Sequence, residues 1–280
     1  MIIKKLQNEQ LEFSSWKSTI GRVAFMNCDP LFLQLSDDWS VLSAPPSWLT
    51  GHLLRRDCII APIPAADYAK NSEELILLPD LGICSKGEVG SVLLFGSKPL
   101  NEMESIALPS DSSSSVALIK YILRYNKLNP KLTVMGPDID RMLESSDGAL
   151  IIGDRALDAS AMHPDKVVLD LGLEWQKITG NPMVFGVFAT RKDTPYDDVK
   201  RAYLSLLEQL VKFESSSERR EHIVQLSSKN SGLTTSRLHK YFCEVFNRLD
   251  GDHIIGLNKF LKDACGPVSY THLTLPTTML

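Results

Sequence analysis

The chain has 280 residues, 44% of them hydrophobic, and its 30 Lys and Arg residues against 34 Asp and Glu residues give a formal charge of −4. This length and composition allow one large or two medium domains with buried cores, and they exclude a disordered or fibrous protein. The charge provides no overall field toward nucleic acid or an anionic membrane, so we expect neither partner and expect local donors to hold any anionic ligand.

The two ends of the chain differ from its middle. The first ten residues turn polar after two apolar ones, unlike a secretory signal, and no segment approaches the roughly 20 apolar residues that span a bilayer. We therefore expect a cytoplasmic protein. Residues 267–280 resemble the translation of a transposase-end adapter used in DNA sequencing libraries, so we expect a non-native tail there and leave it out of the fold.

Short β-branched runs alternate with helical patterns between residues 20 and 190, which is typical of a mainly parallel sheet covered by helices. Strands are predicted at 21–25, 58–62, 90–95, 105–108, 131–135, 149–152 and 183–190. From residue 194 onward the pattern predicts helices only, at 195–213, 217–226, 234–249 and 252–264. Two α/β lobes are the simplest organisation.

The first predicted strand runs into a turn that carries an amide and a carboxylate. Asn27 follows the strand at its carboxyl end, where open α/β sheets bind ligands, and Pro30 begins the next helix. Asn27 or Asp29 could instead simply cap that helix. The residues alone leave binding and capping open.

Four consecutive serines, at 112–115, precede the strongly periodic apolar pattern of 116–123. Hydroxyls and free backbone N–H groups at a helix start form a ready carboxylate site, to which the helix dipole contributes a few tenths to ~2 kcal/mol. An N-cap needs only one of the four serines, so ligand binding and capping again remain open.

Two further turns carry candidate ligand groups. Gly153 and Asp154 follow the predicted strand at 149–152, where Asp154 can cap the next helix or face a ligand. Ser91 places a small hydroxyl at the start of the strand at 90–95, where the chain could cross between lobes.

The sequence contains no pattern for a metal, a nucleotide or a nucleophilic triad. Its six histidines are isolated, its five cysteines are scattered without a Cys-x-x-Cys pair, and neither glycine-rich phosphate motif occurs. We therefore expect neither a metal nor a cofactor.

The order of these motifs along the chain resembles the chorismate dehydratase family of the futalosine route to menaquinone. The matching elements are Gly21-Arg22-Val23 with Asn27 and Pro30, Ile60-Ala61-Pro62-Ile63-Pro64 before Tyr68, Leu78-Pro79-Asp80 with Ile83, Gly87 to Ser91-Val92, Ser112 to Leu118, Ile152-Gly153-Asp154 with Ala156-Leu157, and Leu169-Asp170-Leu171-Gly172 with Trp175, Thr179-Gly180, Pro182 and Val184-Phe185. The resemblance covers roughly residues 20–191. It departs from the family at Ala24-Phe25-Met26, where Ser-Tyr-Leu is usual, and at the all-serine run 112–115, where Ser-Arg-Thr-Ser is usual.

The resemblance implies an α/β architecture, a two-lobed fold of the type 2 periplasmic-binding-protein kind with C-terminal helices packing on the first lobe. By this analogy lobe 1 comprises residues 20–101 and 187–266, and lobe 2 comprises residues 102–186. Residues 1–19 are then an extension ahead of the usual family start.

The resemblance also implies a cofactor-independent hydro-lyase that eliminates the ring hydroxyl of chorismate as water to give 3-[(1-carboxyvinyl)oxy]benzoate. It assigns catalytic roles to Asn27, at the departing hydroxyl or the enolpyruvyl group, and to Ser91 beside it. The base stays open between the enolpyruvyl carboxylate of the substrate, Asp29 and Asp154. The substrate-binding residues that we expect are Ser114, Ser115, Gly153 and Asp154.

Two other hypotheses fit parts of the sequence. The 1,4-dihydroxy-6-naphthoate synthase family shares the implied fold but normally relies on a histidine that has no counterpart here. A non-catalytic module that binds small anions would be either an exported binding protein or the effector domain of a regulator. Against these stand the lack of a signal peptide and of a helix-turn-helix ahead of residue 21.

Overall fold

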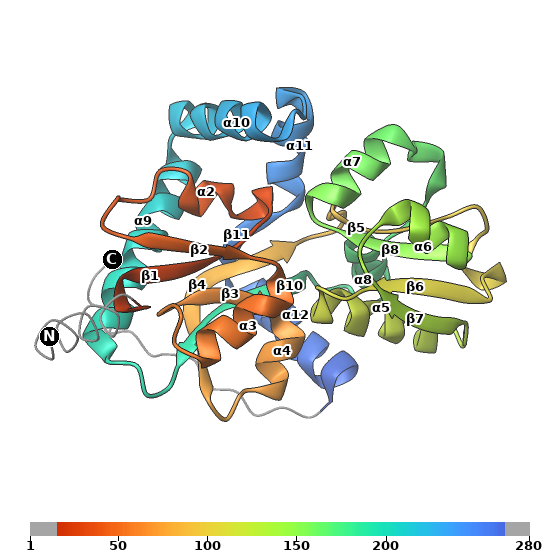
Figure 1. Ribbon diagram of the computed structural model, residues 1–280, viewed down its shortest axis with the longest axis horizontal. Helices are drawn as coiled ribbons and strands as arrows, with labels where there is room; N and C mark the ends of the chain where they lie inside the picture. Colours follow the sequence, from red (N-terminus) through yellow and green to blue (C-terminus); the bar gives the residue numbers. More distant parts are fainter. Residues whose placement is uncertain (1–15, 267–280) are drawn as a thin grey trace, which may run out of the picture.

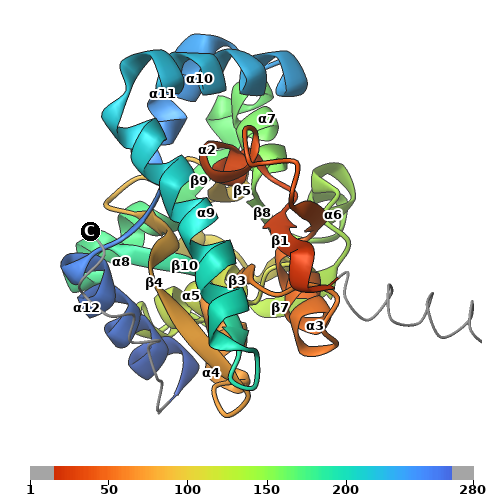
Figure 2. The same cartoon turned by 90° about the vertical axis from the view of Figure 1, so that its left-hand side faces the viewer.

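The computed structural model describes residues 16–266, so the predicted tail at 267–280 and residues 1–15 of the predicted extension lie outside the described residues. The chain forms two α/β lobes that lie side by side (Figure 1). Viewed from one end, the long helix α9 crosses the face of lobe 1 (Figure 2). Within residues 16–266, no helix combines the length and the apolar character needed to cross a bilayer.

Lobe 1 is built on a mixed sheet whose strands come from both halves of the chain. The strands are β1 (Thr19–Val23), β2 (Ser40–Ala44), β3 (Ala61–Pro64), β4 (Leu75–Ser85), β10 (Met183–Arg191) and β11 (Phe246–Leu249). β1 and β2 are parallel, and the other four pair in the order β11-β4-β10-β3. A parallel bridge from Ile20 to Ile60 joins the two groups. β10 is apolar and buried from Met183 to Ala189 because helices cover both faces of its sheet.

The helices of lobe 1 come mostly from the C-terminal part of the chain. They are α2 (Asp29–Phe32), α3 (Pro46–Leu54), α4 (Ala65–Lys70), α9 (Tyr196–Ser215), α10 (Ser217–Ser231), α11 (Thr235–Glu244) and α12 (Gly251–Phe260), with short turns at η1 (Trp16–Ser18), η2 (Met26–Cys28) and the π-helical η5 (Leu261–Cys265). α9 packs on α2 and β4, and α12 packs on β10, which confirms that C-terminal helices cover the first lobe.

Lobe 2 is a five-stranded sheet with helices on both faces. Its elements are β5 (Val92–Gly96), η3 (Leu100–Glu102), β6 (Ser105–Pro109), α5 (Ser113–Tyr125), β7 (Lys131–Met135), α6 (Ile139–Ser145), β8 (Gly148–Ile152), α7 (Asp154–Met162), η4 (Pro164–Lys166), β9 (Val167–Asp170) and α8 (Leu171–Thr179). The strand order is β7-β6-β8-β5-β9. Successive side chains of its strands point to opposite faces of the sheet and enter two separate cores. Leu93 and Ile151 pack in one core with Met142 of α6, and Leu94 packs in the other with Leu118 of α5.

The structure corrects several sequence-based expectations. Both sheets are mixed rather than mainly parallel. In lobe 1, β10 runs antiparallel to β3 and β4, and in lobe 2, β5 enters from the other lobe and runs antiparallel to β8 and β9. The prediction of helices only after residue 194 is wrong at β11, which pairs antiparallel with β4. Strands β2, β4 and β9 are also additional to the predicted set.

The strand pairing also bears on where the chain passes between lobes. The predicted boundaries assign β5 to lobe 1 and the first four residues of β10 to lobe 2. By hydrogen bonding, β5 lies in the sheet of lobe 2 and all of β10 lies in the sheet of lobe 1. The two crossings therefore fall between β4 and β5 and between α8 and β10.

Candidate functional site

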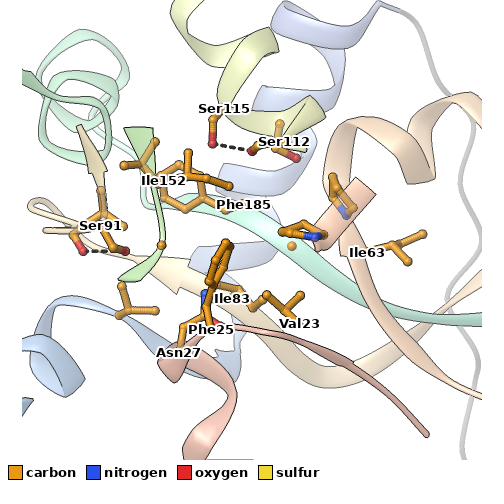
Figure 3. A pocket seen from close by; sticks show the side chains of 18 residues that line it. Val23, Phe25, Asn27, Ile63, Ile83, Ser91, Ser112, Ser115, Ile152 and Phe185 are labelled. Atoms are coloured by element: carbon orange, nitrogen blue, oxygen red, sulfur yellow. Dashed lines mark hydrogen bonds between the residues drawn. The ribbon is translucent and has the colours of Figure 1, made fainter. Parts of the chain in front are cut away.

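A cavity of about 510 Å³, counted with its open mouth, lies between the two lobes. Its walls are mainly apolar, and Figure 3 shows Phe25, Ile83 and Phe185 around the opening with Ile63 and Ile152 at its sides. Such walls suit a compact ring, while the few polar groups among them fix its orientation.

Asn27 stands at the end of β1, in the turn η2 that leads to α2. Phe25, the residue before η2, is extended, and Pro30 stands in the first turn of α2, where its missing N–H is not needed for a helical hydrogen bond. The side-chain Oδ1 of Asn27 is buried and has no hydrogen-bond partner within residues 16–266. A buried amide offers both an acceptor and two donors, so an unpartnered oxygen that borders a cavity is free to bind a ligand.

Ser91 reaches the cavity from the crossing that leads into β5, and it is 3% exposed. Its hydroxyl donates to the carbonyl of Val89 at 3.3 Å and accepts from the Tyr241 hydroxyl at 3.2 Å. The Asp170 carboxylate holds the crossing by accepting the N–H groups of Val89 at 3.0 Å and Gly90 at 2.8 Å. Burial raises the pKa of Tyr241, so this phenol remains a donor to Ser91.

The serine run forms the N-terminus of α5. Ser112 is the N-cap, and its hydroxyl donates to that of Ser115 at 2.8 Å rather than to the backbone. Ser114 accepts the N–H of Ala66 in lobe 1 at 3.2 Å. Ser113 faces away from the cavity, toward the Ser47 hydroxyl at 3.2 Å. The N–H groups of the first helical turn have no intrahelical acceptor. This end of the cavity can therefore bind an anion.

The cavity wall carries no charge. Of the lining residues, all of which fall within 16–266, none has an ionisable side chain. The guanidinium of Arg155 lies behind this wall: its Cζ is 5.5 Å from the centre of the Phe25 ring, and it pairs with the buried Asp111 at 2.5 Å. Within the same described range, no three His, Cys, Asp or Glu side chains gather as metal ligands would.

Five of the six predicted site residues line this one cavity: Asn27, Ser91, Ser114, Ser115 and Gly153. Asp154 is the exception, because its carboxylate accepts the backbone N–H of Met26 at 3.0 and 3.3 Å and does not line the cavity. Burial raises its pKa to about 6.

Asp29, an alternative base in the sequence-based hypothesis, also lies outside the cavity lining. It is 3% exposed and bonded to the Arg22 guanidinium and the Ser227 hydroxyl. Burial raises its pKa. The structure therefore directs this carboxylate toward the packing of α2 against α10 rather than toward a ligand.

Three site features escaped the sequence analysis. Phe25 was noted only as a departure from the usual family tyrosine, yet it covers the lobe interface. Tyr241 lies 150 residues from Ser91 on a helix whose pattern indicates only an amphipathic core element. Asp170 belongs to the matching motif, where it precedes Leu-Gly and looks like a simple helix cap. That local pattern does not predict that its carboxylate also binds the N–H groups of residues 89–90.

Comparisons with known proteins identify the family of the chain. A family model described as menaquinone biosynthesis matches residues 18–265. A chorismate dehydratase of Thermus thermophilus is 32% identical over 193 residues, which cover 63% of this chain and 70% of the relative. A chorismate dehydratase of Campylobacter jejuni is 25% identical over 255 residues, covering 88% and 96% of the two chains.

The fold has solved counterparts as well. A Candida albicans protein described as having the generic periplasmic binding protein fold superposes with a TM-score of 0.64 at 16% identity, over 94% of this chain and 99% of the other. At this identity the likeness shows the fold alone, and it confirms the predicted two-lobed binding-protein architecture.

Proposed function

The chain belongs to the menaquinone-biosynthesis family that includes the chorismate dehydratases, and we propose that it removes one molecule of water from chorismate to form 3-[(1-carboxyvinyl)oxy]benzoate. One observation carries the mechanism. The interlobe cavity combines apolar walls, an amide, hydroxyls and a helix N-terminus, with no ionisable side chain among its described lining residues. This suits an elimination whose base comes from the substrate itself.

The reaction balances without a second reactant. The C–H bond at the ring carbon that bears the enol ether breaks, its electron pair forms a new ring double bond, and the C–O bond to the neighbouring hydroxyl breaks. The proton and the hydroxide leave together as water, and the ring becomes aromatic. No electrons are gained or lost overall, so the proposed reaction needs no redox cofactor.

In this mechanism Asn27 and Ser91 act on the departing hydroxyl. The free Oδ1 of Asn27 accepts the O–H of that hydroxyl. The Asn27 amide N–H donates to its oxygen as negative charge develops, and so does the Ser91 hydroxyl once its proton turns from the Val89 carbonyl to the substrate. The Tyr241 hydroxyl polarises Ser91 by donating to it. The enolpyruvyl carboxylate, held close to the ring, takes the proton, because proximity within one molecule replaces a protein base.

The second carboxylate of the substrate, on the ring, binds at the start of α5. The Ser114 and Ser115 N–H groups and hydroxyls supply donors there, and the helix dipole adds a positive field. Closed lobes exclude water from the cavity, which strengthens each of these hydrogen bonds.

The test is incubation of the purified full chain with chorismate, followed by liquid chromatography with mass spectrometry. We expect a product lighter by one water that matches synthetic 3-[(1-carboxyvinyl)oxy]benzoate, at a rate unchanged by prior dialysis against a chelator. Chorismate that binds but stays intact would instead favour a binding module. A rate abolished by chelation and restored by a metal would refute the cofactor-free mechanism.

A further inference from the structure

The two lobes meet at a point next to Asn27. Asp154 is the first residue of α7 in lobe 2, and its carboxylate accepts the N–H of Met26 in lobe 1 with distances of 3.0 and 3.3 Å. Met26 directly precedes Asn27 in the turn η2. Both views place the start of α7 beside the chain that leads into α2 (Figures 1 and 2). A carboxylate of one lobe therefore caps the turn of the other lobe that carries Asn27.

The capped turn has no acceptor of its own for this N–H. Met26 is 5% exposed, and Phe25, the residue before the turn, makes no side-chain cap. The first N–H groups of a short helical turn lack partners inside the turn. With Asp154 withdrawn, the N–H of Met26 loses the acceptor that the closed structure gives it, and the turn loses its anchor.

A second contact lies beside the first. Gly153 has φ 64° and ψ −146°, a conformation essentially confined to glycine, and a Cβ atom built there would lie 2.6 Å from the Phe25 ring. The Phe25 ring thus rests directly on the Gly153 backbone. Gly153 with Phe25 and Asp154 with Met26 form an interlobe latch, and both residues of its first pair line the cavity.

We propose that Asp154 is a positioning residue that couples closure of the lobes to the placement of Asn27. This inference rests on the proposed function, and it replaces the sequence-based expectation that Asp154 binds substrate. When the lobes separate, the Met26 N–H loses its acceptor and Asn27 is no longer held. When they close, the latch places the Asn27 amide at the cavity wall.

The strength of the latch depends on whether the Asp154 carboxylate is ionised, and its surroundings set that charge state. Burial raises its pKa to about 6, with Asp29 of α2 and Asp158 of α7 raising it further, while the Met26 N–H and Arg22 of β1 lower it. Tyr241 of α11 and Cys28 of η2 face the same carboxylate, and burial keeps both in the neutral form. Above pH 6 the ionised carboxylate is the stronger acceptor. Activity that depends on the latch therefore falls as the pH drops through about 6.

The experiment compares three full-length variants: Asp154→Ala, Asp154→Asn and Asp158→Ala. The alanine variant removes the acceptor, so we expect kcat to fall roughly tenfold to a hundredfold, as befits an unpaired buried donor. The asparagine variant keeps an acceptor oxygen without the charge. We expect its kcat at pH 8 to stay within about fivefold of wild type and its acidic limb near pH 6 to disappear. Asp158→Ala, which removes an exposed carboxylate one turn further along α7, is the matched control: it should keep the wild-type kcat at pH 8, and its acidic limb should move to lower pH because Asp158 raises the pKa of Asp154.

A readout independent of turnover separates the latch from the proposed function. Hydrogen exchange of the peptide that carries residues 23–30, measured without substrate, should speed up at least tenfold in Asp154→Ala and remain unchanged in Asp158→Ala. Faster exchange with no chorismate turnover by the wild type would reject the proposed function but keep the latch. Unchanged exchange, a kcat within twofold of wild type for Asp154→Ala, or an equal loss in the alanine and asparagine variants would each overturn the latch.

Discussion

A methyl group added at Gly153 tests whether closure of the lobes limits activity. Gly153→Ala has two separable costs. The backbone conformation at φ 64° is strained for any residue with a Cβ by about 1–3 kcal/mol, whether the lobes are open or closed. The overlap with the Phe25 ring, at 2.6 Å, adds a packing cost of about 1–3 kcal/mol. Because Phe25 belongs to the other lobe, this second cost applies only to the closed state.

The two costs appear in different measurements. The backbone cost lowers the free energy of unfolding by about 1–3 kcal/mol, measured by urea titration of the variant. The packing cost lowers the closed population, so kcat/KM for chorismate should fall about 5-fold to 150-fold, at a factor of ten per 1.4 kcal/mol. Far-ultraviolet circular dichroism at the assay temperature verifies that the variant is folded.

A double-mutant cycle with Phe25→Ala isolates the contact. In the Phe25→Ala background the ring is absent, so Gly153→Ala should cost much less kcat/KM than it costs in the wild-type background. An equal loss in both backgrounds would show that the Phe25 contact is not the cause. Wild-type kcat/KM for Gly153→Ala alone would refute the link between closure and catalysis.

Three further predictions address single groups of the site. Asn27→Ala should lower kcat about 10²-fold to 10³-fold, as loss of one preorganised donor does, with an unchanged circular dichroism spectrum; turnover at the wild-type rate would remove Asn27 from the mechanism. Tyr241→Phe removes the donor to Ser91 and should lower the free energy of unfolding by about 1 kcal/mol and kcat by up to about tenfold, measured by urea titration and steady-state kinetics. The folded-state pKa of Asp154, about 6, lies above its unfolded value, so wild-type stability should decline by about 2 kcal/mol as pH rises from 4 to 6. Urea midpoints across this range should be flatter in Asp154→Asn, and equal slopes would contradict the shift.

The sequence predicts the elements whose local pattern matches their final environment. The strand predicted at 131–135 matches β7 residue for residue, and β6, β8 and β10 differ from the predicted bounds by one residue. β4 was missed because Pro79 and Asp80, the latter at φ 60°, interrupt its apolar run at the point where β11 pairs with it. β11 was read as the end of a helix, since its edge pairing with β4 is a long-range contact that local periodicity does not contain.

The sequence could predict those site residues that stand at a strand end or a helix start, because such points meet at the carboxyl edge of the sheets. Asn27, Ser91 and the serines come together because each stands at such a point. Asp154 also stands at a helix start, but its carboxylate turns to a backbone group 128 residues away. Whether a polar side chain meets a ligand or the other lobe depends on how the lobes close, and short-range sequence patterns carry no information about that.

The polar groups of the cavity are divided among parts that only closure unites. Asn27 belongs to lobe 1, Ser91 stands at the crossing, and Ser114 and Ser115 begin α5 in lobe 2. An open molecule can therefore hold a carboxylate at α5 while the departing hydroxyl lacks its donors. Binding and elimination are then separable steps. Burial of the ionised Asp154 carboxylate costs stability near neutral pH, and in our proposal this cost is offset because Asp154 positions Asn27 for the elimination step. In the proposed mechanism, a fold that closes around ligands acts as an enzyme because closure completes the donor set around the leaving hydroxyl.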